Sequence, residues 1–421
     1  MRSVNNLAEF IIITCFCMFL FDVTLLGSGA WSINVIGVSI RKIEYAFILL
    51  FVLFTLRGVY NFIYVIEALV FSLVFGLAVP MLNGVNLNYS LAELMPFLGV
   101  LFCPLIVTNK YILNNWQFLK RCMLSFCLLS AVGHILIWCF GLLHLPYADI
   151  TKAMLTNALT SGTEDAIDNI IIADTPDGLF RVLLPNSSLL VVGFYLAIQR
   201  YLEFKTIKHL LYVVIIFVAL YSTWTRALYL SPVIVMLGLF AYKLCPLAIK
   251  LKSYLTYYIL SLAIVMFIII TGLIIHPKVL SVLGIASVSS DDVRFEQVTW
   301  ILNTFIENPL FGTGLGGNAQ YLRSDIAPWT YEMSLMSLIM KIGIIGCMLF
   351  FIIQLTIIPG FFKNFFDGHR LSSNKVLWLL FSFSILVMFS TNPFMLSFPG
   401  VTITVFILGE LLVINKRKVV F

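Results

Sequence analysis

Long apolar segments recur along this chain and constrain its fold more than any other feature. A helix needs about 20 predominantly apolar residues to cross the hydrocarbon core of a bilayer. Segments near this length lie at roughly 7–26, 43–57, 62–82, 91–108, 122–143, 182–199, 209–224, 227–243, 254–275, 333–358, 376–392 and 398–414. The strands of a transmembrane barrel would instead alternate apolar and polar residues. We therefore predict an all-α polytopic integral membrane protein with about 12 transmembrane helices, forming a single transmembrane domain over residues 1–421.

The composition agrees with this class and excludes others. Only 11% of the 421 residues are charged, whereas a soluble domain carries about 25%. A soluble nucleic-acid-binding protein and a disordered chain are therefore excluded. The composition also excludes a secreted disulfide scaffold. The eight cysteines lie in or beside apolar segments, and none has the spacing of a zinc site. We predict no metal and no cofactor.

The basic residues predict the topology through the positive-inside rule. With both termini in the cytoplasm, 17 of the 26 basic residues fall in inner loops. The nine that do not are Arg41, Lys42, Lys152, Arg181, Arg226, Lys278, Arg294, Arg323 and Lys341. Two long loops then face outward. Residues 144–181 form an acidic loop, either simply solvated or acting as a lid or acceptor-binding element, and residues 276–332 form a longer one.

The second outer loop contains a predicted helix and a glycine-rich segment. Ser289 and the residues after it supply helix N-caps, apolar residues then recur at helical spacing, and Asn308-Pro309 ends the pattern. We predict an amphipathic helix lying at the outer membrane interface. Gly312, Gly314 and Gly317 match a dinucleotide-binding spacing but lack its βαβ context. Their backbone N–H groups either bind a phosphate, with Gly314 central, or form a simple turn.

Four outward arginines, namely Arg181, Arg226, Arg294 and Arg323, depart from the positive-inside pattern together. Any one of them could be a snorkelling interface anchor. A shared anionic ligand accounts for all four, because guanidinium groups match phosphate oxygens geometrically.

Five further ionisable residues lie within or beside the apolar segments, namely Asp22, Glu67, Glu93, His134 and Glu332. Such residues are functional candidates by default. For Glu67 and His134 we favour a buried ion pair or a hydrogen-bonded structural partner. Glu332 stands at the outer end of the 333–358 segment, where it suits general acid/base chemistry. Lys341 lies deeper in that segment, where it could pair with one of these acids.

Three segments of the chain combine these residues in recognisable motifs. The first is Arg181 followed by Pro185-Asn186, and the second is Ser222-Thr-Trp-Thr-Arg226. The third runs from Arg294 through Asn308-Pro-Leu-Phe-Gly-Thr-Gly-Leu-Gly316 to the Gly343-Ile-Ile-Gly346 segment. These segments resemble the bacterial O-antigen polymerases and ligases, which act on undecaprenyl-diphosphate-linked sugars. Ligases of this family place a histidine eleven residues before that closing glycine pair, a position held here by Glu332. The departure favours a polymerase over a ligase.

The resemblance implies a metal-independent glycosyltransferase with a GT-C-like fold, acting at the periplasmic face of the bacterial inner membrane. Its donor and acceptor would be undecaprenyl-diphosphate-linked oligosaccharides in membrane lipid, with a chain-length regulator and a flippase as further partners. Within it, Arg226 and Arg294 would bind the diphosphate and Glu332 would activate the acceptor hydroxyl. The predicted substrate-binding residues are Arg181, Arg323, Asn186, Gly314 and Tyr331. A ligase, or a lipid-linked oligosaccharide flippase or transporter, is the alternative.

Overall fold

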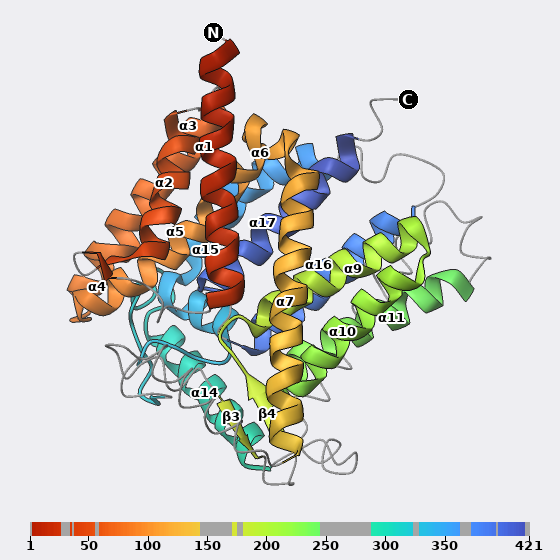
Figure 1. The fold of residues 1–421 in the computed structure, drawn as a ribbon. Helices are drawn as coiled ribbons and strands as arrows, with labels where there is room; N and C mark the ends of the chain where they lie inside the picture. Colours follow the sequence, from red (N-terminus) through yellow and green to blue (C-terminus); the bar gives the residue numbers. More distant parts are fainter. Residues whose placement is uncertain are drawn as a thin grey trace. The chain divides into compact units, whose positions relative to one another are not determined.

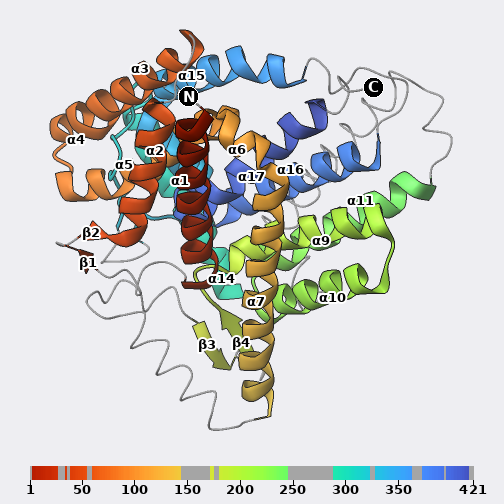
Figure 2. The ribbon, with the colours of Figure 1, turned by 45° about the horizontal axis from the view of Figure 1, so that its top comes forward.

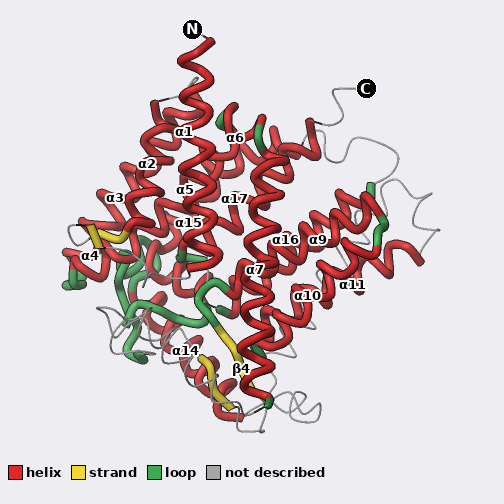
Figure 3. Tube along the Cα trace, in the orientation of Figure 1, coloured by secondary structure: helices red, strands yellow, loops and turns green. Residues whose placement is uncertain are grey.

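A computed structural model describes residues 2–26, 34–35, 38–54, 59–143, 171–174, 180–244, 288–322, 328–362, 372–392 and 395–416. This part of the chain is mostly helical (Figure 3). Its helices are Arg2–Phe21 (α1), Ile40–Phe54 (α2), Val59–Leu73 (α3), Val79–Leu82 (α4), Leu87–Thr108 (α5), Lys110–Asn114 (α6), Trp116–Leu142 (α7), Leu190–Phe204 (α9), Ile207–Ser222 (α10), Arg226–Leu244 (α11), Val288–Glu307 (α14), Ser334–Phe362 (α15), Ser373–Thr391 (α16) and Phe398–Lys416 (α17). Two antiparallel hairpins, Asn34–Val35 with Val38–Ser39 (β1, β2) and Ile171–Asp174 with Phe180–Leu183 (β3, β4), are exceptions to the predicted all-α chain.

Six of the described helical segments are long and apolar enough to cross a membrane, which identifies an integral membrane protein. They are Leu7–Leu25, Phe62–Leu82, Leu87–Thr108, Trp116–Leu142, Arg226–Lys243 and Ser373–Ser390. Four shorter apolar helices, Ile43–Phe54, Ile207–Ser222, Ser334–Phe350 and Phe398–Ile414, coincide with further predicted spans. The predicted span at 254–275 lies outside the described residues. The total of about twelve spans and the topology stay predictions.

The chain folds into two compact units, each built from separate stretches of sequence. The first comprises Met1–Tyr64, Gly99–Val233 and Ser397–Phe421. The second comprises Val65–Leu98 and Ile234–Leu396. The predicted site residues are therefore divided between the units, with Arg181, Asn186 and Arg226 in the first and Arg294, Gly314, Tyr331 and Glu332 in the second.

In the first unit, α7, α9 and α10 pack against one another in pairs (Figures 1 and 2). The first ten residues of α9, Leu190 to Gln199, are all buried. The sharp turn after α9 is made by Lys205, whose left-handed backbone lets its N–H group bond the Tyr201 carbonyl at 2.8 Å. This turn brings α10 back along α9, and the apolar faces of the two helices cover each other.

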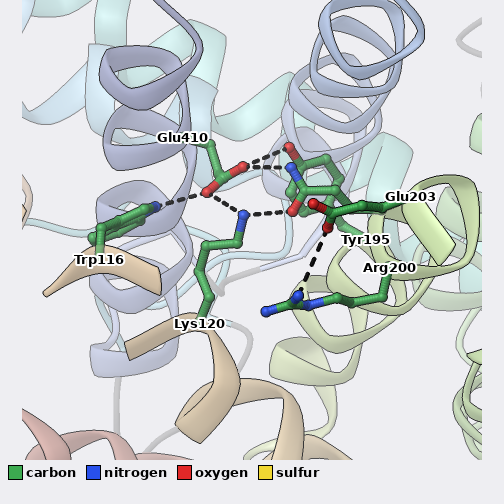
Figure 4. A network of polar contacts seen from close by, with 7 residues as sticks. Trp116, Lys120, Tyr195, Arg200, Glu203 and Glu410 are labelled. Atoms are coloured by element: carbon green, nitrogen blue, oxygen red, sulfur yellow. Dashed lines mark hydrogen bonds and ion pairs between the residues drawn. The ribbon is translucent and has the colours of Figure 1, made fainter. Parts of the chain in front are cut away.

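A buried polar network connects α7, α9 and α17 within this unit (Figure 4). The Lys120 ammonium lies 2.8 Å from one Glu410 carboxylate oxygen and 2.5 Å from the Gln199 side-chain oxygen. Glu410 also accepts hydrogen bonds from the Trp116 indole at 2.7 Å, the Gln199 amide at 2.9 Å and the Tyr195 hydroxyl at 3.2 Å. The two buried charges thus offset each other and also form hydrogen bonds, as a buried ion pair requires.

The sequence predicted a transmembrane span over 182–199, and its first part is wrong. The chain there forms strand β4 and then a turn, and α9 begins at Leu190. Pro185 has no N–H group for a helix, and the Ser187 side chain accepts a hydrogen bond from the Leu184 N–H group at 2.9 Å. The apolar residues at the start of the predicted span therefore form a strand, because Pro185 and the Ser187 hydrogen bond prevent the helix from beginning before Leu190.

The β3–β4 hairpin contains the described residues of the predicted acidic outer loop, which are 171–174 and 180–181. Ile172 and Val182 are register partners, and with Ile137 and Phe180 they form a buried cluster. The Trp138 indole donates to the Phe180 carbonyl at 2.9 Å. This hairpin therefore packs on the end of α7 (Figure 2). The loop's acidic residues other than Asp174 lie outside the described residues.

In the second unit, α14 confirms the predicted helix in the loop 276–332, and it ends at Glu307 just before Asn308-Pro309. Phe295, Leu302 and Ile306 form an exposed apolar stripe along it, with exposed fractions of 68%, 42% and 70%. Gln297 and Ile301 face the protein interior instead. An exposed apolar stripe is the property that the predicted location at the membrane interface requires.

Helix α15 is broken at Gly343, and the glycine-rich segment packs into the break. The backbone angles of Gly343, φ 61° and ψ −172°, are adopted essentially by glycine alone. The Met340 carbonyl accepts from the Thr313 N–H group at 3.1 Å, and the Ile344 N–H group donates to the Pro309 carbonyl at 2.9 Å. The break thus exchanges helical hydrogen bonds for bonds to the segment 309–314.

Replacing Gly343 with Ala is expected to destabilise the protein by roughly 3 kcal/mol, because the required backbone conformation is strained for any residue with a Cβ atom. The added Cβ would also lie 2.4 Å from the Leu310 carbonyl oxygen. Thermal unfolding of the purified protein in detergent measures the effect. Gly133→Ala in α7 is the matched control, since a Cβ there meets nothing within 4 Å. Equal midpoints for the two variants would contradict this role of Gly343.

Candidate functional site

An ion pair in the second unit joins two residues that the sequence analysis singled out. The Arg294 Nε atom, on the second turn of α14, lies 2.6 Å from a Glu332 carboxylate oxygen. Both side chains are 21% exposed, so the pair is half-buried. The site is partly solvated, so its carboxylate could transfer a proton and its guanidinium could bind a phosphate.

The main chain at Glu332 is also fixed by α14. Its N–H group donates to the Gln297 side-chain oxygen at 3.1 Å. Gln297 follows Arg294 by three residues, so the two side chains lie on one face of the helix. Side chain and backbone of Glu332 are therefore both held by α14.

Tyr331 fastens the segment that precedes Glu332. Its hydroxyl accepts from the Ala319 N–H group at 2.7 Å and donates to the Tyr321 carbonyl at 3.1 Å. Its side chain is 1% exposed and packs with Ile301 and Met340. These contacts occupy the hydroxyl within the fold, and its predicted role in substrate binding stays a prediction.

Burial raises the pKa of Tyr331 from 10.0 to about 12, although the Ala319 N–H group lowers it and the Glu93 carboxylate raises it further. The raised pKa means that folding favours the neutral phenol. Its contribution to stability is present below pH 10 and is lost as the pH rises through about 12. We expect the thermal midpoint to fall over this window in the parent protein, and to fall less steeply in Tyr331→Phe. Parallel pH profiles for the two proteins would contradict this.

A second ion pair in this unit confirms the predicted pairing of Lys341 with an acid. The Lys341 ammonium lies 2.5 Å from a Glu93 carboxylate oxygen, and both side chains are buried. Lys341 also donates to the Trp329 carbonyl at 2.6 Å, and Glu93 accepts from the Gly316 N–H group at 2.7 Å. The pair therefore fixes both the glycine-rich segment and the segment that leads to Glu332.

The glycine-rich segment uses its N–H groups within the fold. The Gly314 N–H group donates to the Lys341 carbonyl at 2.9 Å, and a Cβ at Gly314 would lie 2.5 Å from the Pro80 ring. The Gly312 N–H group bonds the Asn308 carbonyl at 2.9 Å. This arrangement matches the predicted turn, and phosphate binding by Gly314 stays an untested prediction.

In the first unit, Arg181 contacts the turn that carries Arg226. The Arg181 Nε atom donates to the Thr223 carbonyl at 2.9 Å, and Nη2 donates to the Thr225 hydroxyl at 3.1 Å. Between these two partners lies Trp224, whose φ of 47° is in the left-handed region. Arg226 follows directly as the first residue of α11. Arg181 thus stabilises the strained turn next to Arg226.

Asn186 is buried among residues of three segments. Its amide nitrogen donates to the Ser130 hydroxyl at 3.2 Å and to the Thr24 carbonyl. The neighbouring Ser187 hydroxyl is bonded to His134 Nε2 at 2.9 Å, and His134 Nδ1 lies 2.8 Å from the Ser130 carbonyl. These contacts confirm the predicted hydrogen-bonded structural role of His134, and they connect the turn before α9 to α7.

The prediction of a hydrogen-bonded or ionic partner for Glu67 is wrong for the described part of the chain. Glu67 is 2% exposed, and neither carboxylate oxygen has a hydrogen-bond partner among the described residues. Val70 and Phe71, one turn further along α3, are apolar and offer none. Arg323, another predicted site residue, lies outside the described residues.

Sequence reasoning missed Gln297, which the structure places against Glu332. Its position one helical turn after Arg294 is the signal that could have indicated it. No protein-family model matches the chain, and a comparison with curated proteins found no match.

Proposed function

We propose that the protein is a polymerase of O-antigen or a related surface polysaccharide, joining undecaprenyl-diphosphate-linked repeat units at the periplasmic face of the inner membrane. The proposal combines the resemblance of three sequence segments with one geometric observation. That observation is the contact of 2.6 Å between Arg294 and Glu332, which lie 38 residues apart in the sequence.

In the proposed reaction, Glu332 accepts the proton of an acceptor sugar hydroxyl. The hydroxyl oxygen forms a bond to the anomeric carbon of the donor chain, and the bond from that carbon to the diphosphate oxygen breaks. The electron pair leaves with undecaprenyl diphosphate. Arg294 offsets the negative charge that develops on this leaving group, the type of electrostatic stabilisation that contributes most in many enzymes.

The resting ion pair fits this division of roles. A diphosphate carries more charge than a carboxylate and competes for the guanidinium. Donor binding would then draw Arg294 away from Glu332, and the carboxylate would become available to the acceptor hydroxyl. Diphosphate binding by Arg226, which lies in the first unit, is a prediction from the sequence alone and is tested separately by Arg226→Ala.

The products that accumulate in a deletion strain test the proposal. Loss of a polymerase leaves single repeat units on the lipid anchor, and the full-length gene restores long chains. Purified protein with repeat units extracted from that strain should release one undecaprenyl diphosphate per new glycosidic bond. Accumulation of lipid-linked polymer would identify a ligase instead and would overturn the proposal.

The buried ion pairs favour a second candidate, a lipid-linked oligosaccharide flippase or transporter. Lys120–Glu410 and Glu93–Lys341 both lie in apolar helices, and transporters place charged residues there. The same deletion strain separates the candidates. A flippase defect leaves neither repeat units nor polymer at the outer face.

A further inference from the structure

Gln297 is a fully buried residue of the Arg294–Glu332 site, and one of its polar groups has no partner in the part of the chain that the structure describes. Its exposed fraction is 0%. The side-chain oxygen accepts the Glu332 N–H group at 3.1 Å. Its amide nitrogen, Nε2, has no hydrogen-bond partner among the described residues.

The orientation of this amide follows from its contact with Glu332. Oxygen and nitrogen of a glutamine are assigned from the hydrogen-bond network. Exchanging them would place an N–H₂ group against the Glu332 N–H group, and two donors cannot bond each other. The oxygen therefore faces Glu332, and the two amide protons point elsewhere.

A buried donor without an acceptor is uncommon in native proteins and lowers stability. The neighbouring Arg294 guanidinium has only donors and cannot satisfy it. The Gln297 amide nitrogen therefore has no acceptor oxygen among the described residues, although Gln297 contacts Glu332, the residue to which we assign proton transfer.

We propose that Gln297 is a substrate-positioning residue whose amide nitrogen donates to an oxygen of the bound substrate. The acceptor is a sugar hydroxyl or a diphosphate oxygen, which have this chemistry in common. Because the oxygen of the same amide holds the Glu332 backbone, substrate recognition and the position of the base would be coupled through one side chain. This inference rests on the proposed polymerase function.

Two substitutions separate the donor from the acceptor of this side chain. Gln297→Glu keeps an oxygen for the Glu332 N–H group and loses the amide donor, while Gln297→Met loses both. The Glu variant adds a charge, and the Met variant also loses the acceptor. The amide donor is the group that both variants lack, so an effect that both share is caused by its loss. Asn303→Asp is the matched control, because it makes the same amide-to-acid change at an exposed position on α14.

Polymerisation by the full-length protein is measured with two competing probes. The repeat-unit oligosaccharide released from its lipid carries the sugar hydroxyls without diphosphate, and inorganic diphosphate carries phosphate oxygens without sugar. We expect both Gln297 variants to raise the inhibition constant of one probe by about tenfold. The Asn303→Asp control should leave both constants unchanged.

A shift confined to the oligosaccharide identifies a sugar hydroxyl as the acceptor, and a shift confined to diphosphate identifies a phosphate oxygen. Unchanged constants for both probes in both Gln297 variants, with thermal midpoints like the parent protein, would overturn the inference. Failure of the parent protein to polymerise repeat units would instead reject the proposed function.

Discussion

Glu332→Gln is expected to slow polymer formation by about 10²–10⁴-fold, the usual contribution of a general acid or base. Glutamine preserves the size of the side chain and its backbone contact with Gln297 but does not accept the proton. The release of undecaprenyl diphosphate by the purified protein measures the rate. The polysaccharide chain length in a complemented deletion strain gives the matching cellular result.

Glu307→Gln is the matched control, because Glu307 is exposed at the end of α14 and should tolerate the same change. Arg294→Ala should also reduce the rate, since it removes the partner that lies 2.6 Å from Glu332. If both Glu332→Gln and Arg294→Ala variants still build long polysaccharide, the assignment of these residues is wrong.

Lys120→Met is expected to destabilise the protein by about 3–5 kcal/mol, because it leaves the buried Glu410 carboxylate without its cation. The double variant Lys120→Met/Glu410→Gln should recover a large part of that loss. It buries no charge, and glutamine can still accept from the Trp116 indole. Thermal and denaturant unfolding of the purified protein measure both effects.

The Arg200–Glu203 pair on α9 provides the control. Its atoms are 3.7 Å apart and the Glu203 side chain is 47% exposed, so Glu203→Gln should change stability by less than about 1 kcal/mol. A double variant as unstable as Lys120→Met alone would show that packing around Lys120, rather than its charge, stabilises the three helices.

Local patterns in the sequence predicted much of what the structure describes. Apolar run lengths located most of the described membrane helices, and the caps with Asn308-Pro309 located α14. The scarcity of charge within apolar segments also predicted that Lys341 pairs with an acid. These predictions succeed because each depends on neighbouring residues or on the high cost of an unpaired charge in an apolar environment.

Other features depended on partners distant in the sequence. Run length predicts that a membrane helix starts at residue 182, yet this segment pairs with β3, and Arg181 contacts the turn before Arg226. Glu67 was expected to have a partner and has none among the described residues. Run length and periodicity carry no information about which distant segment supplies a hydrogen bond.

The sequence by itself determined that this is a helical membrane protein and which charged residues are out of place in it, because bilayer thickness and the cost of burying charge act on every segment separately. Only the tertiary structure decided that Arg294 contacts the Glu332 carboxylate and that Gln297 accepts a hydrogen bond from the Glu332 N–H group. It also decided that the glycine-rich segment packs into the break of α15 at Gly343. Those contacts join residues 27 or more positions apart, and only the packing of helices and loops brings such residues within hydrogen-bond distance.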